Sequence, residues 1–354
     1  MKSLLLLSWV GCCLALIGAV GCNKNTGKPR VAFITNNPES FWTIAEAGAQ
    51  KAEAEFGVEL IFRKPSPGNA ATQKVAIDAA LDRGVKAIAI SVFDPKTQSE
   101  YLDEVAARVP LICQDNDAPL TKRLAYLGTD NYAAGRAAGK LVKETLGEAG
   151  GTVVIFVGTL ESLNAKQRRQ GVLDELADRK APADTSDFPL SPDGEKYGKY
   201  TMYSKTYLDQ PEGGKRAKEN AEDALTKIPA DANVCMVGLY AYNPPMILSA
   251  IADLKDEARR KRIKIVGFDE DPATLAGIKA GTVHATVVQD PYNFGYAAVK
   301  MMASLAKGDR TVLPKGGIQY IPHRIVAKEA GELNGEKRLG VEAFSNELDK
   351  LLGK

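Results

Sequence analysis

The stretch that most constrains the fold is residues 263–292, IKIVGFDEDPATLAGIKAGTVHATVVQDPY. It predicts a buried strand over 263–268, a carboxylate at its end in Asp269, a short proline-started helix, and a second strand over 284–288. In open parallel α/β sheets, ligands bind just beyond the carboxyl ends of the strands, where loops converge and helix N-termini point inward. Asp269 therefore occupies a position where a ligand site is expected.

The same alternation of strand and helix runs through most of the chain. Asn37-Pro38-Glu39 predicts a helix start with Asn37 as N-cap, and Gly57 predicts its end. Regular alternation of this kind is typical of βαβ units and a parallel sheet. The predicted strands are residues 31–34, 58–62, 87–90, 110–113, 124–127, 152–157, 234–239, 263–268 and 284–288.

Composition limits the class of protein. A chain of 354 residues with 45% hydrophobic and 25% charged residues suits two ordinary globular domains better than one. A net charge of +2 without a block of Lys and Arg argues against nucleic acid as the main partner.

The N-terminus predicts export. Residues 4–20 form an apolar run that is too short and too poorly flanked for a membrane span. The run ends in Ala19-Val20-Gly21-Cys22, which resembles a bacterial lipobox, although leucine is commonest where Ala19 stands. The resemblance implies a lipoprotein signal peptide over 1–21, diacylation of Cys22, and a tether over 22–29; an ordinary secretory signal is the alternative.

No metal or cofactor is expected. After processing, Cys113 and Cys235 remain, each within an apolar run that predicts a buried strand, so we expect free thiols in different lobes. The two histidines, His284 and His323, are far apart, and no Cys/His spacing fits a metal site.

Motifs near the predicted strand ends occur in a definite order between residues 30 and 327. They are VAFITNNP (31–38), FW (41–42), GVKAIAIS (84–91), LICQD (111–115), GTDN (128–131), Asn164-Ala165 with Arg168 and Gly171, YNPP (242–245), VGFD (266–269) and ATVVQDP (285–291). In this order they resemble the type I periplasmic sugar-binding proteins of the ribose-binding kind.

The resemblance implies an α/β fold of two Rossmann-like lobes with parallel sheets, joined by a hinge of three strands. The first lobe is expected to comprise 30–130 plus 290–317, and the second 131–289 plus 318–330. Residues 331–354 are expected to form a polar tail that ends in a short amphipathic helix, and residues 181–200 a long surface loop.

A sugar presents hydroxyls that donate and accept, together with an apolar face. Its site needs carboxylates and amides as partners, a guanidinium fork and an aromatic plate. The positions matched to the family supply this set: carboxylate acceptors, amides, one arginine, one small hydroxyl, and two rings to cover the sugar. The expected ligand-binding residues are Phe41, Trp42, Ser91, Asp115, Asn164, Arg168, Asn243, Asp269 and Gln289.

Several assignments have plainer alternatives. Asp115 fits a turn, Asp269 a helix cap, and Arg168 a solvated helix face, while Asn37 is open between cap and ligand. Phe41 and Trp42 also fit core positions on the first helix, although at least one of them is expected to line the cleft, and Tyr242 is a weaker ligand candidate.

Departures from the ribose-binding pattern leave the sugar open. Asn116 stands where the family often has arginine, Ser91-Val92-Phe93 stands where ribose binders have an asparagine, and Tyr242-Asn243-Pro244-Pro245 replaces the usual Asn-Asp-Glu run. A pentose, a hexose, a polyol or a nucleoside-like ring all fit these changes.

The expected function is therefore that of an extracytoplasmic, lipid-anchored, monomeric binding protein of an ABC sugar importer, which closes about its hinge on a monosaccharide or polyol. The alternative is a sugar-sensing protein that presents its ligand to a membrane receptor kinase. We expect no enzyme activity: a hydrolase using Asp115 and Asp269 needs a proton donor that nothing marks, and no G-x-G-x-x-G follows the first strand. A sugar-sensing repressor would carry a DNA-binding headpiece where this chain has a signal peptide.

Overall fold

The computed structural model describes residues 27–210 and 212–354. The expected signal peptide over 1–21 and the lipidation site Cys22 lie outside this range, as does most of the expected tether. Within it, no helix combines the length and the apolar character that crossing a membrane requires.

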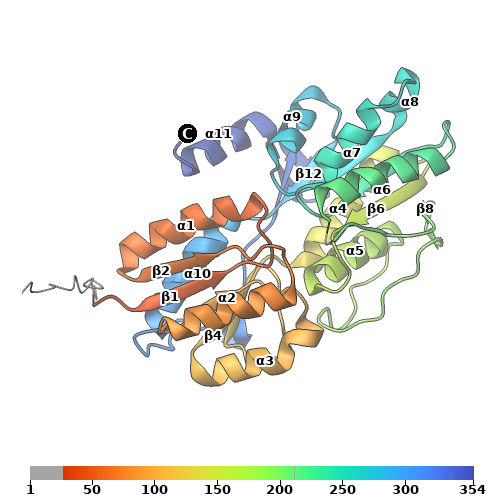
Figure 1. Ribbon diagram of the computed structural model, residues 1–354. Helices are drawn as coiled ribbons and strands as arrows, with labels where there is room; N and C mark the ends of the chain where they lie inside the picture. The colour runs from red at the N-terminus through yellow and green to blue at the C-terminus, as the bar shows by residue number, and fades with distance from the viewer. Residues whose placement is uncertain (1–26, 211) are drawn as a thin grey trace, which may run out of the picture.

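The first lobe is built on a six-stranded sheet in which every neighbouring pair is parallel. Helices α1 (Phe41–Phe56) and α10 (Pro291–Leu305) cover one face, and α2 (Ala70–Asp82) and α3 (Pro95–Arg108) the other (Figure 1). The strands in sheet order are β13 (Ile318–Tyr320), β5 (Ala125–Gly128), β4 (Leu111–Gln114), β3 (Ile88–Ile90), β1 (Arg30–Ile34) and β2 (Glu59–Arg63).

The second lobe contains a ten-stranded mixed sheet. Its central strands are parallel, and antiparallel pairs occur only toward its two edges. The strands in sheet order are β15 (Gly331–Leu333), β16 (Glu336–Gly340), β14 (Arg324–Ala327), β12 (Ala285–Val288), β11 (Lys264–Phe268), β10 (Val234–Gly238), β6 (Gly151–Val157), β8 (Tyr200–Met202) and β7 (Lys196–Tyr197), with β9 (Tyr207–Leu208) also on β6.

Helices cover both faces of this second sheet, each face with its own apolar core. Helices α4 (Asn131–Leu146) and α5 (Leu163–Leu176) lie on one face, and the short α8 (Glu257–Arg262) precedes β11. The helices of the other face are α6 (Gly214–Lys227), α7 (Asn243–Ala252), α9 (Pro272–Ala280) and α11 (Val341–Leu351). The predicted α/β class with parallel sheets in two lobes is confirmed.

The chain passes between the sheets three times, between β5 and α4, between β12 and α10, and between β13 and β14. Two expectations need correction. Residues 318–320 form β13 and pair with β5, so they belong to the first sheet rather than to the second lobe. Residues 331–340 form β15 and β16 rather than a tail, because β16 pairs with β14 and extends the second sheet, while the expected terminal helix is present as α11. The expected loop over 181–200 ends in the β7–β8 ribbon.

The first helix begins later than its sequence pattern predicts. It starts at Phe41, and the Asn37 side chain instead accepts hydrogen bonds from the backbone N–H of Glu39 at 3.0 Å and from the indole Nε1 of Trp42 at 2.9 Å. Gly57 ends the helix with a φ of 66°, as predicted, because glycine adopts this left-handed conformation without steric cost. Cys113 and Cys235 are buried, unpaired, and lie on different sheets.

Candidate functional site

Two aspartates occupy equivalent strand ends in the two lobes. Asp115 follows β4 with a φ of 60°, and Asp269 follows β11 with a φ of 65°. Each donates its backbone N–H to the neighbouring strand, Asp115 to Leu127 O at 3.0 Å and Asp269 to Val287 O at 2.7 Å. A residue other than glycine with positive φ carries roughly 1–3 kcal/mol of strain, and such residues cluster at ligand sites. The backbone therefore turns each carboxylate away from its own sheet, in both cases at the carboxyl end of a strand.

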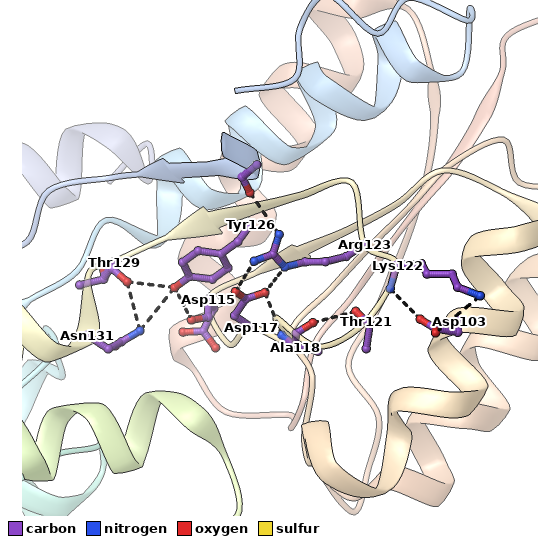
Figure 2. Close-up of polar contacts among 11 residues, drawn as sticks. Asp103, Asp115, Asp117, Ala118, Thr121, Lys122, Arg123, Tyr126, Thr129 and Asn131 are labelled. Carbon is purple, nitrogen blue, oxygen red and sulfur yellow. Dashed lines mark hydrogen bonds and ion pairs between the residues drawn. The ribbon is translucent and has the colours of Figure 1, made fainter. Parts of the chain in front are cut away.

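Polar contacts from the hinge side hold Asp115 in this conformation (Figure 2). The Tyr126 hydroxyl lies 2.9 Å from the backbone carbonyls of both Asp115 and Thr129. Asn131, at the start of α4, donates from Nδ2 to Thr129 O at 3.2 Å. Ser91 donates its hydroxyl to Asp115 Oδ2 at 2.7 Å, so this carboxylate is oriented before any ligand binds.

Arg168 projects from α5 and is the one cation among the residues that line the pocket between the lobes. Its side chain is 2% exposed, donates from Nε to Asn131 Oδ1 at 2.8 Å and from Nη1 to Leu239 O at 3.0 Å, and stacks 4.0 Å above the Phe268 ring. Its Nη2 is buried and has no hydrogen-bond partner within the described residues. A fixed guanidinium with one free nitrogen is suited to donate to a ligand oxygen.

Burial and the arginine act in opposite directions on the two carboxyls. Burial raises the pKa of Asp115, while the positive charge of Arg168 and the Ser91 hydrogen bond oppose the rise. Burial also raises the pKa of Asp269 to about 6, against Arg168 and the bond from Gln289 Nε2 to Asp269 Oδ1 at 3.0 Å. The negative charge of Asp115 adds to the rise, so it makes Asp269 harder to ionise.

These groups line one pocket between the lobes, with a cavity volume of about 50 Å³. Small-molecule pockets commonly measure about 300–1,000 Å³, so the pocket in this conformation is far smaller than a usual ligand site. The backbone N–H of Asn164 donates across the cleft to Asn116 Oδ1 at 3.0 Å, which holds the lobes together. The lining residues are Asn36, Asn37, Glu39, Phe41, Trp42, Asp115, Asn164, Arg168, Tyr240, Ala241, Tyr242, Asp269 and Gln289.

All but two of the expected ligand residues line this pocket. Ser91 lies behind Asp115, to which it donates. Asn243 is fully buried and uses both ends of its amide within the protein: Oδ1 accepts from Tyr240 N–H at 2.9 Å, and Nδ2 donates to Asp209 Oδ2 at 2.8 Å. The structure therefore gives Ser91 and Asn243 supporting positions rather than direct ones.

The aromatic walls come from both lobes. Trp42 lines the pocket but is only 2% exposed, since its indole is bonded to Asn37 and packs edge-on against Phe33 and Phe41. Phe41 is half-buried. On the other side, Tyr240 and Tyr242 meet edge to face, with ring centroids 6.0 Å apart.

Some lining residues were missed by the sequence reasoning. Asn36, Glu39, Tyr240 and Ala241 were not proposed, while Asn37 and Tyr242 were left open. Tyr240 carried the same signal as the aspartates, because it stands just beyond the end of β10. The sequence around Glu39 indicates only a helix start.

The chemistry of the lining suits a neutral ligand rich in hydroxyls. Glu39, Asp115 and Asp269 are opposed by Arg168 alone, which disfavours anions. No cluster of His, Cys, Asp and Glu fit for a metal ion occurs in residues 27–210 and 212–354. A larger cavity of about 560 Å³ lies at the opposite end of β11 and β12, where the strands begin, away from all these groups.

Comparisons with known proteins agree with this geometry. Residues 31–310 match the periplasmic binding protein domain. The ribose import binding protein of Haemophilus influenzae is 25% identical over 302 residues, which cover 83% of this chain and 91% of that protein. The D-allose-binding periplasmic protein of Escherichia coli is 24% identical over 289 residues, covering 78% and 83%. The glucose-galactose binding protein GanP of Geobacillus stearothermophilus aligns with a TM-score of 0.72 at 26% identity, covering 85% of this chain and 98% of that one. The chain therefore belongs to the periplasmic binding protein family.

Proposed function

We propose that this protein binds a neutral monosaccharide or related polyol between its lobes and delivers it to an ABC importer. The observation that carries the proposal is the pair of strand-end aspartates, one on each sheet, that line one pocket with Arg168. Relatives named for ribose import and for D-allose binding support the same ligand class.

Binding is coupled to closure because the ligand contacts are divided between the lobes. Phe41, Trp42 and Asp115 belong to the first lobe, and Arg168 and Asp269 to the second. Gln289 lies on the crossing that follows β12. A ligand that touches both sets binds the closed form more tightly than the open form, and this differential affinity shifts the population toward closure.

The polar groups have distinct roles toward such a ligand. Asp115 and Asp269 accept hydroxyl hydrogens, and the free Nη2 of Arg168 donates to a hydroxyl or ring oxygen. The half-buried Phe41 ring offers an apolar surface to the C–H face of the sugar, with Trp42 behind it. The protein needs no chemical step for this role, which is binding and release.

The finer assignments rest on the N-terminal sequence. Cys22 carries the lipid, residues 22–29 tether the lobes to the membrane, and the protein acts outside the cytoplasm as a monomer. Its partner is the permease of the importer, which meets the joint surface of the closed lobes.

The test is calorimetry on a soluble protein that begins at residue 27. The titrants are ribose, allose, arabinose, glucose, galactose and ribitol, with ribose 5-phosphate as the anionic counterpart. We expect at least one neutral sugar or polyol to bind in a one-to-one ratio and the phosphate to bind far more weakly. Absence of binding by the whole neutral panel, or preference for the phosphate, would refute the proposal.

A further inference from the structure

A second cavity of about 410 Å³ lies between the lobes beside the sugar pocket; we call it the lateral groove. One wall is the start of α1, and the other is formed by α9 and the C-terminal helix α11, which lies above α1 in Figure 1. In α11, Val341 and Phe344 are buried in the core and Leu348 packs against it. The volume of the lateral groove falls within the range of about 300–1,000 Å³ that is usual for small-molecule sites.

The walls of the lateral groove are apolar on both sides. Phe41 and Ile44 line it from α1, Leu275 from α9, and Leu348 and Leu352 from the C-terminal segment. Apolar side chains left facing a cavity gain free energy when an apolar group displaces water from them.

The lateral groove also carries charged side chains. Asp269, Asp271 and Asp349 line it together with Lys279 and Lys354. Glu270 lines it too, and burial and the neighbouring Asp269 charge raise the pKa of this carboxyl well above its usual range. The carboxyls outnumber the lysines, so the groove disfavours an anionic occupant, while its apolar side chains favour an apolar one.

The lateral groove adjoins the sugar pocket. Phe41, Ala241 and Asp269 line both cavities. A substituent that passes Phe41 from a sugar held by Asp269 would therefore reach the groove.

We propose that the lateral groove is a second subsite, which takes an uncharged apolar group attached to the sugar. The full ligand class is then a glycoside with an aryl or alkyl aglycone rather than a free monosaccharide alone. This inference rests on the proposed function, because it requires the sugar ring to occupy the pocket between the lobes.

The test compares methyl and phenyl glycosides, in both anomers, of the monosaccharide that binds, by calorimetry on the protein from residue 27. We expect one phenyl glycoside to bind roughly tenfold or more tightly than its methyl counterpart, from the apolar area buried by the ring. In the double variant Leu348→Asp/Leu352→Asp, this gain should disappear while the methyl glycoside keeps its affinity. The matched control is Leu351→Asp, because Leu351 is 38% exposed and does not line the groove; it should keep both affinities.

Other results would overturn the subsite. A free sugar that binds while neither methyl glycoside does would show that the anomeric end is enclosed. A phenyl gain that is absent, or that survives in the double variant, would remove the groove from recognition. Equal weakening of methyl and phenyl glycosides in the double variant would show that α11 instead closes onto α1. If no sugar or glycoside binds at all, the proposed function falls and the subsite with it.

Discussion

Replacing Arg168 by lysine is the most informative change to the pocket, because it keeps the positive charge and removes the branched guanidinium group with its several N–H donors. The guanidinium makes bonds of 2.8 Å to Asn131 and 3.0 Å to Leu239, which fix its plane above Phe268. A lysine ammonium cannot donate to both Asn131 and Leu239 and also place a third N–H where the free Nη2 of Arg168 lies.

The expected loss follows from one charge-assisted hydrogen bond to the ligand. Such a bond contributes about 1.5–3 kcal/mol, which corresponds to roughly 10–150-fold in Kd. A displaced positive charge would also oppose the pKa rise of Asp115 and Asp269 less effectively. The pH at which binding weakens should therefore move upward in Arg168→Lys.

Calorimetry against the tightest neutral sugar, repeated from pH 5 to 8, measures both effects. Arg169→Lys is the matched control, because Arg169 is equally buried on the same helix but bonds to Thr206 and Asp193 instead of lining the pocket. Thermal unfolding of both variants shows whether each remains folded. Unchanged affinity in Arg168→Lys, or an equal loss in folded Arg169→Lys, would refute the assigned role.

Three further predictions concern the carboxylates and the anchor. Replacing Asp115 or Asp269 by alanine should weaken sugar binding by about 2–5 kcal/mol, the scale for unpairing buried charged hydrogen bonds, and wild-type Kd values in both folded variants would contradict this. Because burial raises the pKa of Asp269 to about 6 and this carboxylate accepts hydroxyl hydrogens when ionised, affinity should fall as the pH drops through 6; a Kd that stays flat between pH 7 and 5 would be the contrary result. In the full-length protein, Cys22→Ser should abolish incorporation of a palmitate analogue, since the thiol is the acyl acceptor, and persistent label would show that the lipid is elsewhere.

Much of the fold was predictable because its strands are buried on both faces. Runs such as 152–157 and 234–239 stand out as continuous apolar segments, and the structure places β6 and β10 there. The exposed edge of the second sheet, formed by β15 and β16, was not predictable in this way. Strands β15 and β16 carry charged residues such as Glu332 and Lys337, and a polar edge strand has no more sequence signal than a tail.

The pocket was predictable where a strand end fixes the side chain. Asp115 and Asp269 follow their strands directly, and the topology brings the two ends together. Residues further beyond a strand end were harder to predict, because the direction of their side chains depends on tertiary contacts. The sequence predicts Asn243 as a ligand amide. Its side chain instead donates a hydrogen bond to Asp209, which lies 34 residues away in the sequence, and so it points into the protein.

The central claim, that one sugar bridges Asp115 and Asp269 and closes the lobes, is tested most directly by a distance across the cleft. Gly68, just before α2, lies against Asn37 within the first lobe. Gly213, just before α6 in the second lobe, lies against the Glu39 carboxylate of the first lobe. The starts of α2 and α6 therefore both border the opening of the pocket between the lobes. Spin labels on exposed Ala71→Cys and Lys215→Cys would report this distance by double electron–electron resonance, while the buried Cys113 and Cys235 would escape labelling.

The measurement is made on the protein from residue 27, with and without a saturating neutral sugar that calorimetry has shown to bind. The account predicts a broad or longer distance distribution without sugar and a single shorter distance with it, and no such shift in the Asp115→Ala or Asp269→Ala background at the same sugar concentration. An identical distribution with and without the bound sugar would contradict the account.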